Sequence, residues 1–166
     1  MISKKRLKAV TSLIPFMAAI LLGVMGASLI KITLNPVIVS GVSMSPTYKN
    51  GDILRSEAIS GKEDLTRGSV VVFLAENKKM VKRVVGLPGE TIQIIDGEIY
   101  INSAIDHSFD QDPIEAPGCA ARPLTLGVNE YFVMGDNRNK SNDSRDFGPV
   151  AYKNIKAKVT GTILVR

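Results

Sequence analysis

Two side chains of this sequence could together attack a carbonyl group, namely the hydroxyl of Ser43 and the amine of Lys82. Ser43 lies in the segment Ser40-Gly41-Val42-Ser43-Met44-Ser45-Pro46-Thr47, which is bounded by glycine and proline and follows an apolar run. A serine hydroxyl becomes a good nucleophile only when a neighbouring base takes its proton. The chain has one histidine, His107, in a polar loop without the neighbours of a catalytic motif. The base must therefore be another residue.

Lys82 is the best candidate for that base. It is flanked by Met80, Val81, Val84 and Val85, and apolar neighbours can desolvate a lysine amine into its neutral form. The adjacent cation Arg83 would favour the neutral amine further. From these residues alone, Ser43 could equally be a serine that caps a turn, and Lys82 could be a solvated lysine of a strand. The chemical interpretation is a serine–lysine dyad.

The elements that must position these two residues are predicted to be strands. Ser43 should follow an extended apolar strand over 34–39, and Lys82 should lie within a strand over 80–85. A further pair of strands should flank Asp96-Gly97, because this dipeptide between β-rich runs is a strong signal for a type I′ hairpin. Period-2 alternation from Ile155 to Arg166 indicates a half-buried strand. Other strands are expected at 53–55, 69–74, 91–95, 98–101 and 130–134.

The sequence therefore predicts a mainly β fold, with antiparallel strands in one domain over residues 33–166. The segment 103–127 contains Pro113, Pro117 and Pro123 among several acidic residues, so we expect an irregular surface excursion there. No strong amphipathic helix and no internal repeat is evident in the sequence.

Charge is concentrated at the amino terminus. The formal net charge is +5, and five basic residues lie within the first 31 positions, whereas the 16 acidic residues are balanced by the remaining basic ones. A neutral body lacks the electrostatic footprint of a nucleic-acid-binding protein. The single Cys119 cannot form an intramolecular disulfide, and a zinc site is not expected without a second cysteine or clustered histidines.

An uncharged stretch of 22 residues separates Lys8 from Lys31. As a helix it is long enough to cross the roughly 30 Å hydrocarbon core of a bilayer. We expect a basic cytoplasmic flank over residues 1–8, a transmembrane anchor over 9–32 and an extracytoplasmic body, because positive flanks stay on the cytoplasmic side. The alternative is a cleaved signal peptide, but its apolar region would be shorter, at about 7 to 15 residues.

Three separated blocks of this chain resemble those of the bacterial type I signal peptidases, which are membrane-bound leader peptidases. The blocks are 40–47, 80–90 and 135–150, and they follow the hydrophobic segment in the order found in the family. The resemblance covers nearly the whole chain apart from about 103–127. It implies a signal-peptidase-like β domain behind one transmembrane helix in the bacterial cytoplasmic membrane.

The resemblance also implies roles for individual residues. Ser43 matches the nucleophile and Lys82 the general base of the family. Ser141 matches the serine that orients the lysine amine, while Asp143 and Arg145 match a structural ion pair beside the site. No metal or other cofactor is implied.

In the oxyanion region, the amide of Ser43 is the natural first donor. Some relatives have a serine two positions before the nucleophile as a second donor, where this chain has Gly41. The implied substrates are secreted preproteins whose signal peptides are cut after small residues. Shallow pockets for those residues would be lined by side chains that flank the dyad, with Val39, Met44, Tyr48, Met80 and Val81 as candidates.

Three other functions compete with this interpretation. Self-cleaving repressors also use a serine–lysine dyad, but they should lack the anchor and carry a DNA-binding segment. The small inner-membrane peptidase subunits of mitochondria differ mainly in compartment. An inactive membrane-tethered binding module would have no need for Ser43 and Lys82.

Overall fold

A computed structural model describes Met17, Ala19 and residues 36–108 and 112–165. The chain divides into two compact units, Met1–Asn35 and Pro36–Arg166. In the first unit Met17 and Ala19 are helical and exposed. The rest of the anchor predicted over 9–32 lies outside the described residues, as does the basic flank. Among the described residues, no helix is long and apolar enough to cross a membrane.

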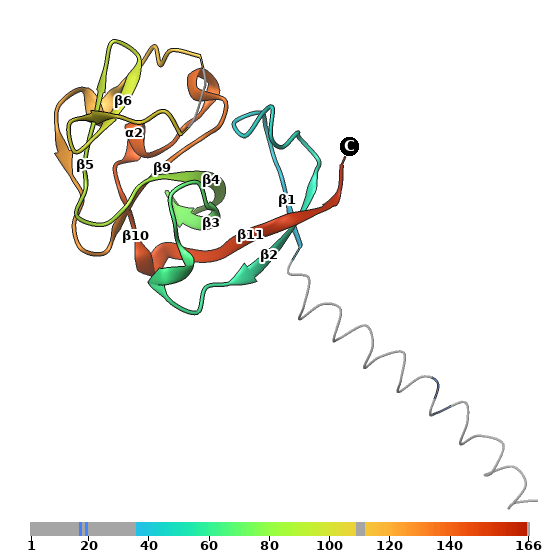
Figure 1. Ribbon diagram of the computed structural model, residues 1–166. Coiled ribbons are helices and arrows are strands. Elements are labelled where there is room, and N and C mark those ends of the chain that lie inside the picture. The colour runs from blue at the N-terminus through green and yellow to red at the C-terminus, as the bar shows by residue number, and fades with distance from the viewer. Residues whose placement is uncertain (1–16, 18, 20–35, 109–111, 166) are drawn as a thin grey trace, which may run out of the picture. The chain divides into compact units, whose positions relative to one another are not determined.

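The second unit consists mainly of antiparallel strands (Figure 1), which confirms the predicted mainly β fold. A seven-stranded sheet has the order β1-β2-β11-β3-β4-β9-β10, and a four-stranded sheet has the order β7-β6-β5-β8. The strands of the larger sheet are β1 Pro36–Ile38, β2 Ile53–Ala58, β3 Val70–Ala75, β4 Lys78–Gly86, β9 Glu130–Met134, β10 Val150–Ala151 and β11 Ile155–Leu164. Those of the smaller sheet are β5 Thr91–Ile95, β6 Glu98–Ile101, β7 Ala104–Ile105 and β8 Leu124–Thr125.

Short helical turns connect some of the strands. One is the α-helical turn α2, Ser144–Phe147, and the others are 3-10 turns at Lys62–Asp64, Gly118–Ala121, Arg138–Lys140 and Tyr152–Asn154. The turns at Arg138–Lys140 and Ser144–Phe147 both belong to the third sequence block, which folds directly after β9.

The hairpin predicted around Asp96-Gly97 is present, with β5 paired to β6 from Ile95 and Glu98 onward. Asp96 has φ 51° and Gly97 has φ 84°. A type I′ turn requires positive φ at both central positions, and glycine and aspartate tolerate this backbone better than most residues. The local sequence therefore determines this turn.

Strands β3 and β4 form the centre of the larger sheet. Val70 to Phe73 are buried, as the run of apolar residues predicts, because β3 lies between β11 and β4. The register pairs Val71 with Lys82. Lys82 is therefore placed within a packed sheet instead of on a solvated strand face.

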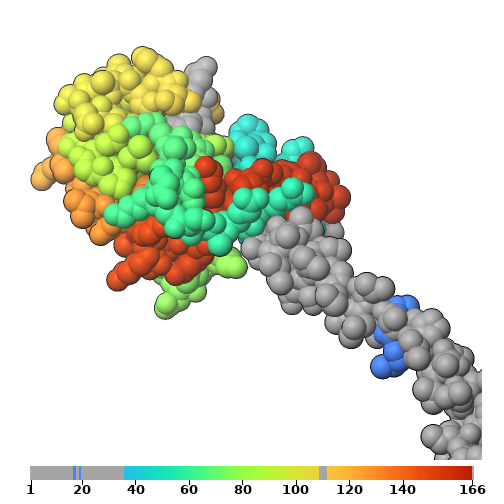
Figure 2. All heavy atoms as spheres, turned by 60° about the horizontal axis from the view of Figure 1, so that its bottom comes forward, coloured from blue at the N-terminus to red at the C-terminus, as the bar shows by residue number. Residues whose placement is uncertain are grey.

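The alternation predicted for the last strand holds only over its first half. Ile155 and Val159 are buried, but the pairing of β11 with β2 shifts register between Val159 and Gly161 and again between Thr162 and Leu164. Beyond these shifts Ile163 is 41% exposed and Leu164 is 45% exposed, so neither face of the strand is buried. The expected half-buried pattern is therefore wrong at this end of β11. Figure 2 shows β2 and β11 side by side on one face.

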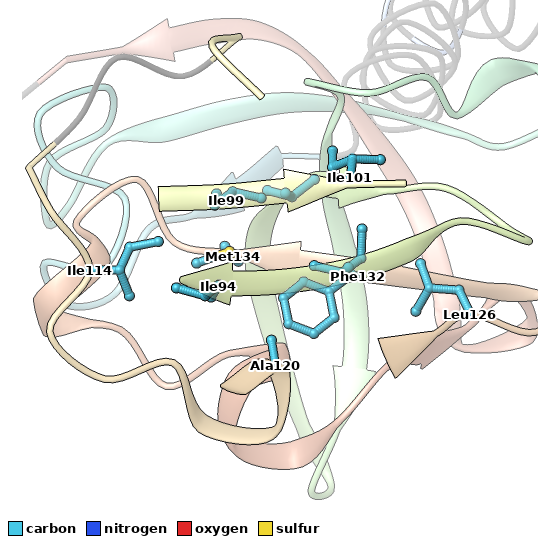
Figure 3. Packing of buried hydrophobic residues seen from close by; sticks show 10 residues of the cluster. Ile94, Ile99, Ile101, Ile114, Ala120, Leu126, Phe132 and Met134 are labelled. Atoms are coloured by element: carbon cyan, nitrogen blue, oxygen red, sulfur yellow. The ribbon is translucent and has the colours of Figure 1, made fainter. Parts of the chain in front are cut away.

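The prediction of an irregular surface excursion over 103–127 is wrong in part. The described part of this segment contains β7, a 3-10 turn and β8. Ile114, Ala120 and Leu126 are buried in a cluster with Phe132 of β9 and residues of the β5–β6 hairpin (Figure 3). The prolines and acidic residues limit regular structure, but apolar side chains spaced between them still reach a core between the two sheets.

Candidate active site

Ser43 lies on a loop between β1 and β2 that is closed at its base. Val39 donates its N–H to the carbonyl of Asp52 at 2.9 Å, and Gly51 donates to the carbonyl of Val39 at 2.9 Å. The residue after the serine, Met44, is only 1% exposed and packs in a core with Leu54, Val70, Val72 and Val159. An anchored neighbour holds the Ser43 backbone in place.

Gly41 forms the turn that leads into this loop. Its φ of +88° lies in a region that residues with a Cβ rarely adopt. Its N–H donates to Oδ1 of Asn50 at 2.9 Å, so this amide is already occupied. By contrast, the Ser43 N–H donates to no group in the part of the chain that the structure describes. The predicted oxyanion region therefore offers the Ser43 amide, whereas Gly41 shapes the loop.

The structure brings Lys82 of β4 into contact with Ser43, which lies on the loop between β1 and β2. The Lys82 amine nitrogen Nζ donates to the Ser43 hydroxyl oxygen Oγ at 2.6 Å. Lys82 is only 5% exposed. A base and a nucleophile at this separation are within the range needed for direct proton transfer.

Burial lowers the pKa of Lys82 below its ordinary value, because a buried amine loses the water that stabilises its charged form. The carboxylates of Asp143 and Asp136 oppose this by favouring the ammonium, and the cation Arg145 lowers the pKa further. The expectation that Arg83 is the cation that favours the neutral amine is wrong, because the cation that lowers the pKa of Lys82 is Arg145. Successive side chains of a strand point to opposite faces, and Arg83 pairs with Asp136.

Asp143 and Arg145 form the ion pair expected from the sequence. The pair has a nitrogen–oxygen distance of 2.9 Å, with side chains 0% and 5% exposed respectively. Asp143 also caps α2 by accepting from the Arg145 N–H at 3.2 Å, and its Oδ2 accepts from the Gly135 N–H at 3.0 Å. Arg145 donates onward to the carbonyls of Arg138 and Ala116. The pair therefore connects both ends of the third block.

Ser141 lies close to the backbone of Ser43. Gly135 leaves no room for a Cβ, because a Cβ there would collide with both the Ser141 hydroxyl and the Ser43 carbonyl oxygen. The Ser141 hydroxyl is buried and has no hydrogen-bond partner among the described residues. A buried hydroxyl without a partner is uncommon and points to a group that engages another at some stage of function.

The five residues predicted to line the substrate pockets differ in their burial. Val39 and Met44 are buried in a core next to the loop that carries Ser43, and Tyr48 and Val81 pack half-buried at the edge of that core. Met80 packs half-buried against a different cluster. The burial of Val39 and Met44 does not fit a place in shallow surface pockets, and for Tyr48, Val81 and Met80 the expectation stays a prediction.

Sequence reasoning missed several contacts that hold the site together. The Asn137 N–H donates to the Ser43 carbonyl at 3.0 Å. Arg83 binds both carboxylate oxygens of Asp136, at 2.7 Å from Nε and 2.5 Å from Nη2. These contacts join β4, the loop that carries Ser43 and the third block. No local sequence pattern predicts them, because the segments are far apart in the chain.

Asn139 is exposed, and its side chain forms two hydrogen bonds to the backbone of another segment. Its side chain accepts from the Glu115 N–H at 3.0 Å and donates to the Pro113 carbonyl at 3.0 Å. An amide that both donates and accepts can bind a neighbouring backbone segment as another strand would. Asn139 thereby fastens the segment around Ile114 to the third block.

The arrangement can support nucleophilic catalysis by a serine with a buried lysine as base. Within the described ranges, no group of three or more histidine, cysteine, aspartate or glutamate residues is placed to hold a metal ion.

Comparison with known proteins places this chain in a family. The model of the family "Signal peptidase, peptidase S26" matches residues 10–164. The signal peptidase I V of Bacillus subtilis is 37% identical over 135 residues, covering 70% of this chain and 78% of the relative. The signal peptidase I of Bacillus licheniformis is 34% identical over 158 residues, covering 88% of this chain and 85% of the relative.

A crystal structure of a signal peptidase I from Enterococcus faecalis is also similar, with 28% identity and a TM-score of 0.49 over 57% of this chain and 96% of that chain. The family match spans nearly all of the chain, and the two Bacillus relatives match it at over 30% identity along most of their own length. This chain therefore belongs to the signal peptidase family of S26 serine endopeptidases.

Proposed function

We propose that this protein is a membrane-anchored serine endopeptidase that removes signal peptides from secreted preproteins, with Ser43 as nucleophile and Lys82 as general base. The observation that carries the proposal is the 2.6 Å contact between the buried Lys82 amine and the Ser43 hydroxyl. Family membership and the names of the Bacillus relatives support the substrate class.

In the proposed reaction, neutral Lys82 accepts the Ser43 proton while Oγ attacks the substrate carbonyl. The negative oxygen of the tetrahedral intermediate accepts a hydrogen bond from the Ser43 N–H. Lys82 then gives its proton to the leaving amine as the peptide bond breaks. Water, activated by the same amine, hydrolyses the acyl-enzyme and regenerates the Ser43 hydroxyl.

Ser141 is proposed to orient the Lys82 amine. Its hydroxyl is buried beside the Ser43 carbonyl, and a group held there can engage the amine once the Ser43 proton has moved. Asp143 and Arg145 are proposed to be positioning residues that take no part in the chemistry. Their ion pair holds Gly135 and the third block against the loop that carries Ser43.

The substrate is proposed to bind as an added strand. Strand β1 lies at one end of the seven-stranded sheet and leads directly into the nucleophile loop. An extended peptide can pair with such an edge and present alternate side chains to shallow pockets, which suits a requirement for small residues before the cut. Tyr48, Val81 and Met80 remain proposed contacts for those side chains.

The membrane assignment rests on the 22 uncharged residues behind a basic flank. We propose a single-pass anchor over 9–32 in the bacterial cytoplasmic membrane, with residues 1–8 inside and residues 33–166 outside.

The test of this function is cleavage of a labelled preprotein in detergent or lipid by the full chain. Wild type should release a signal peptide by a cut after a small residue, and Ser43→Ala should release none. A Ser43→Ala variant that cleaves at the wild-type rate would overturn the proposal.

A further inference from the structure

The side chain of Asn50 forms a hydrogen bond that the chemistry described above does not use. Its Oδ1 accepts from the Gly41 N–H at 2.9 Å, across the loop between β1 and β2. Nearer to the strands, backbone groups close the same loop, because Val39 donates to Asp52 and Gly51 donates to Val39. An amide side chain can accept a backbone N–H as a strand carbonyl does. Asn50 therefore extends the closed base of the loop from Val39 to Gly41.

The stretch 40–42, directly before the proposed nucleophile, is exposed. A Cβ placed on Gly41 would meet no atom of the described residues within 4 Å, apart from its own chain neighbours. Gly41 has a φ of +88°, and glycine loses more backbone freedom on folding than any other residue. The ordered conformation of Gly41 therefore depends on hydrogen bonding, and Asn50 binds its N–H.

A second hydrogen bond orients the peptide group between Val42 and Ser43. The Val42 carbonyl accepts from the Ser45 N–H at 3.1 Å. In a planar trans peptide group the carbonyl and the N–H point in opposite directions, so this bond also sets the direction of the Ser43 N–H. The contacts of Asn50 and Ser45 thus restrain the peptide groups before Gly41 and after Val42. The backbone that leads into the Ser43 N–H is held from both ends.

A simpler interpretation is that Asn50 only forms a turn. Asn50-Gly51 is a common turn dipeptide, and Gly51 has a φ of +92°. An asparagine that stabilises its own turn bonds to a backbone group two residues ahead. The Asn50 side chain instead reaches Gly41, nine positions earlier in the chain. The contact therefore restrains the approach to the nucleophile and is not needed for the turn itself.

We propose that Asn50 is a positioning residue for Ser43, because its side-chain oxygen holds Gly41 and so keeps the Ser43 N–H in the direction required of an oxyanion donor. The proposal rests on the proposed function, in which this N–H binds the negative oxygen of the tetrahedral intermediate. It adds a residue that acts on the nucleophile loop from the side of β2, separate from Lys82 and Ser141.

The experiment uses the full chain in detergent, a labelled preprotein and two variants of Asn50. Asn50→Leu keeps the size of the side chain and removes the acceptor oxygen, whereas Asn50→Asp keeps an acceptor. Asn50→Leu should lower kcat by roughly two- to tenfold, as the loss of one exposed hydrogen bond allows, with little change in KM. Asn50→Asp should stay within about twofold of the wild-type kcat. A wild-type kcat in Asn50→Leu, or an equal loss in both variants, would overturn the proposal.

The matched control is Asn102, an exposed asparagine of the smaller sheet whose Oδ1 accepts from the Thr91 N–H at 2.9 Å. Asn102→Leu removes the same kind of hydrogen bond at a residue with φ 50°, which leucine tolerates poorly. Its loss of stability should therefore be at least as large as that of Asn50→Leu, yet its kcat should equal that of wild type. The same fall in kcat at both positions would attribute the effect to stability and refute the positioning role.

A second measurement does not depend on cleavage. Amide hydrogen exchange followed by NMR should be faster at Gly41 in Asn50→Leu than in wild type, and unchanged there in Asn102→Leu. Unaltered exchange at Gly41 in Asn50→Leu would overturn the proposal whatever the activity. Failure of the proposed function is distinct, because then wild type itself would show no cleavage that depends on Ser43.

Discussion

The amine of Lys82 lies 2.6 Å from the hydroxyl of Ser43, although the two residues belong to different strand–loop units of the chain. Lys82 is part of the central strand β4, whereas Ser43 lies on a loop that is held from below by the buried side chain of Met44. The contact thus joins a rigid strand to an anchored loop, which is the geometry that a nucleophile and its base require.

The first prediction concerns these two residues. Ser43→Ala and Lys82→Ala should each abolish preprotein cleavage, and the double variant should be scarcely slower than either single one, because nucleophile and base act as a unit. Initial rates with a labelled preprotein measure this, and circular dichroism checks the fold. Near-normal turnover by Lys82→Ala would contradict the dyad.

The second prediction concerns pH. Lys82 must be neutral to accept a proton, and burial lowers its pKa, so the rate should rise as pH increases through that lowered pKa and level off above it. Below the pKa, kcat/KM should fall about tenfold per pH unit, because the neutral fraction falls by that factor. A pH–rate profile measures this. Lys79→Ala, on the exposed start of β4, should keep the same profile.

The third prediction concerns the ion pair of Asp143 and Arg145. Arg145→Met leaves the Asp143 carboxylate buried without its partner, so the free energy of unfolding should fall by about 3–5 kcal/mol. Urea denaturation measures this.

The control for the ion pair is Arg67→Met at the partly exposed pair Arg67–Glu90, where water screens the charges. Its expected loss is about 1 kcal/mol or less. Equal losses at the two pairs would show that burial does not decide their contributions.

The fourth prediction concerns Ser141. Ser141→Ala removes the buried hydroxyl beside the Ser43 carbonyl and should lower kcat by roughly ten- to hundredfold, as expected for a misplaced catalytic group, with little change in KM. Steady-state kinetics separates the two constants. Ser141→Thr restores a hydroxyl and should recover part of the rate, whereas full activity of Ser141→Ala would remove this residue from the site.

The fifth prediction concerns topology. A protease added outside spheroplasts should digest residues 33–166, because the basic flank keeps the amino terminus inside. A tag placed before residue 8 should stay protected until the membrane is permeabilised. The reverse pattern of protection would invert the proposed orientation.

Much of the fold follows from local patterns in the sequence. The strand from Glu130 to Met134 and the hairpin around Asp96-Gly97 are confirmed at their predicted bounds. Their signals are short-range, since a run of apolar residues and a turn dipeptide act within a few positions of one another. Ser43 and Lys82 were predicted through the resemblance of three sequence blocks to a known family, because the residues alone also fit a serine that caps a turn and a solvated lysine.

Only the tertiary structure decided which distant groups meet and which side chains are buried. It placed Arg145 instead of Arg83 among the charges that lower the pKa of Lys82, because Arg83 is taken up by Asp136. It also buried Ile114 within a segment whose composition suggests a surface loop, and it shifted the phase of β11 beyond Val159. Burial and pairing depend on partners far away in the chain, so no periodicity within one segment can determine them.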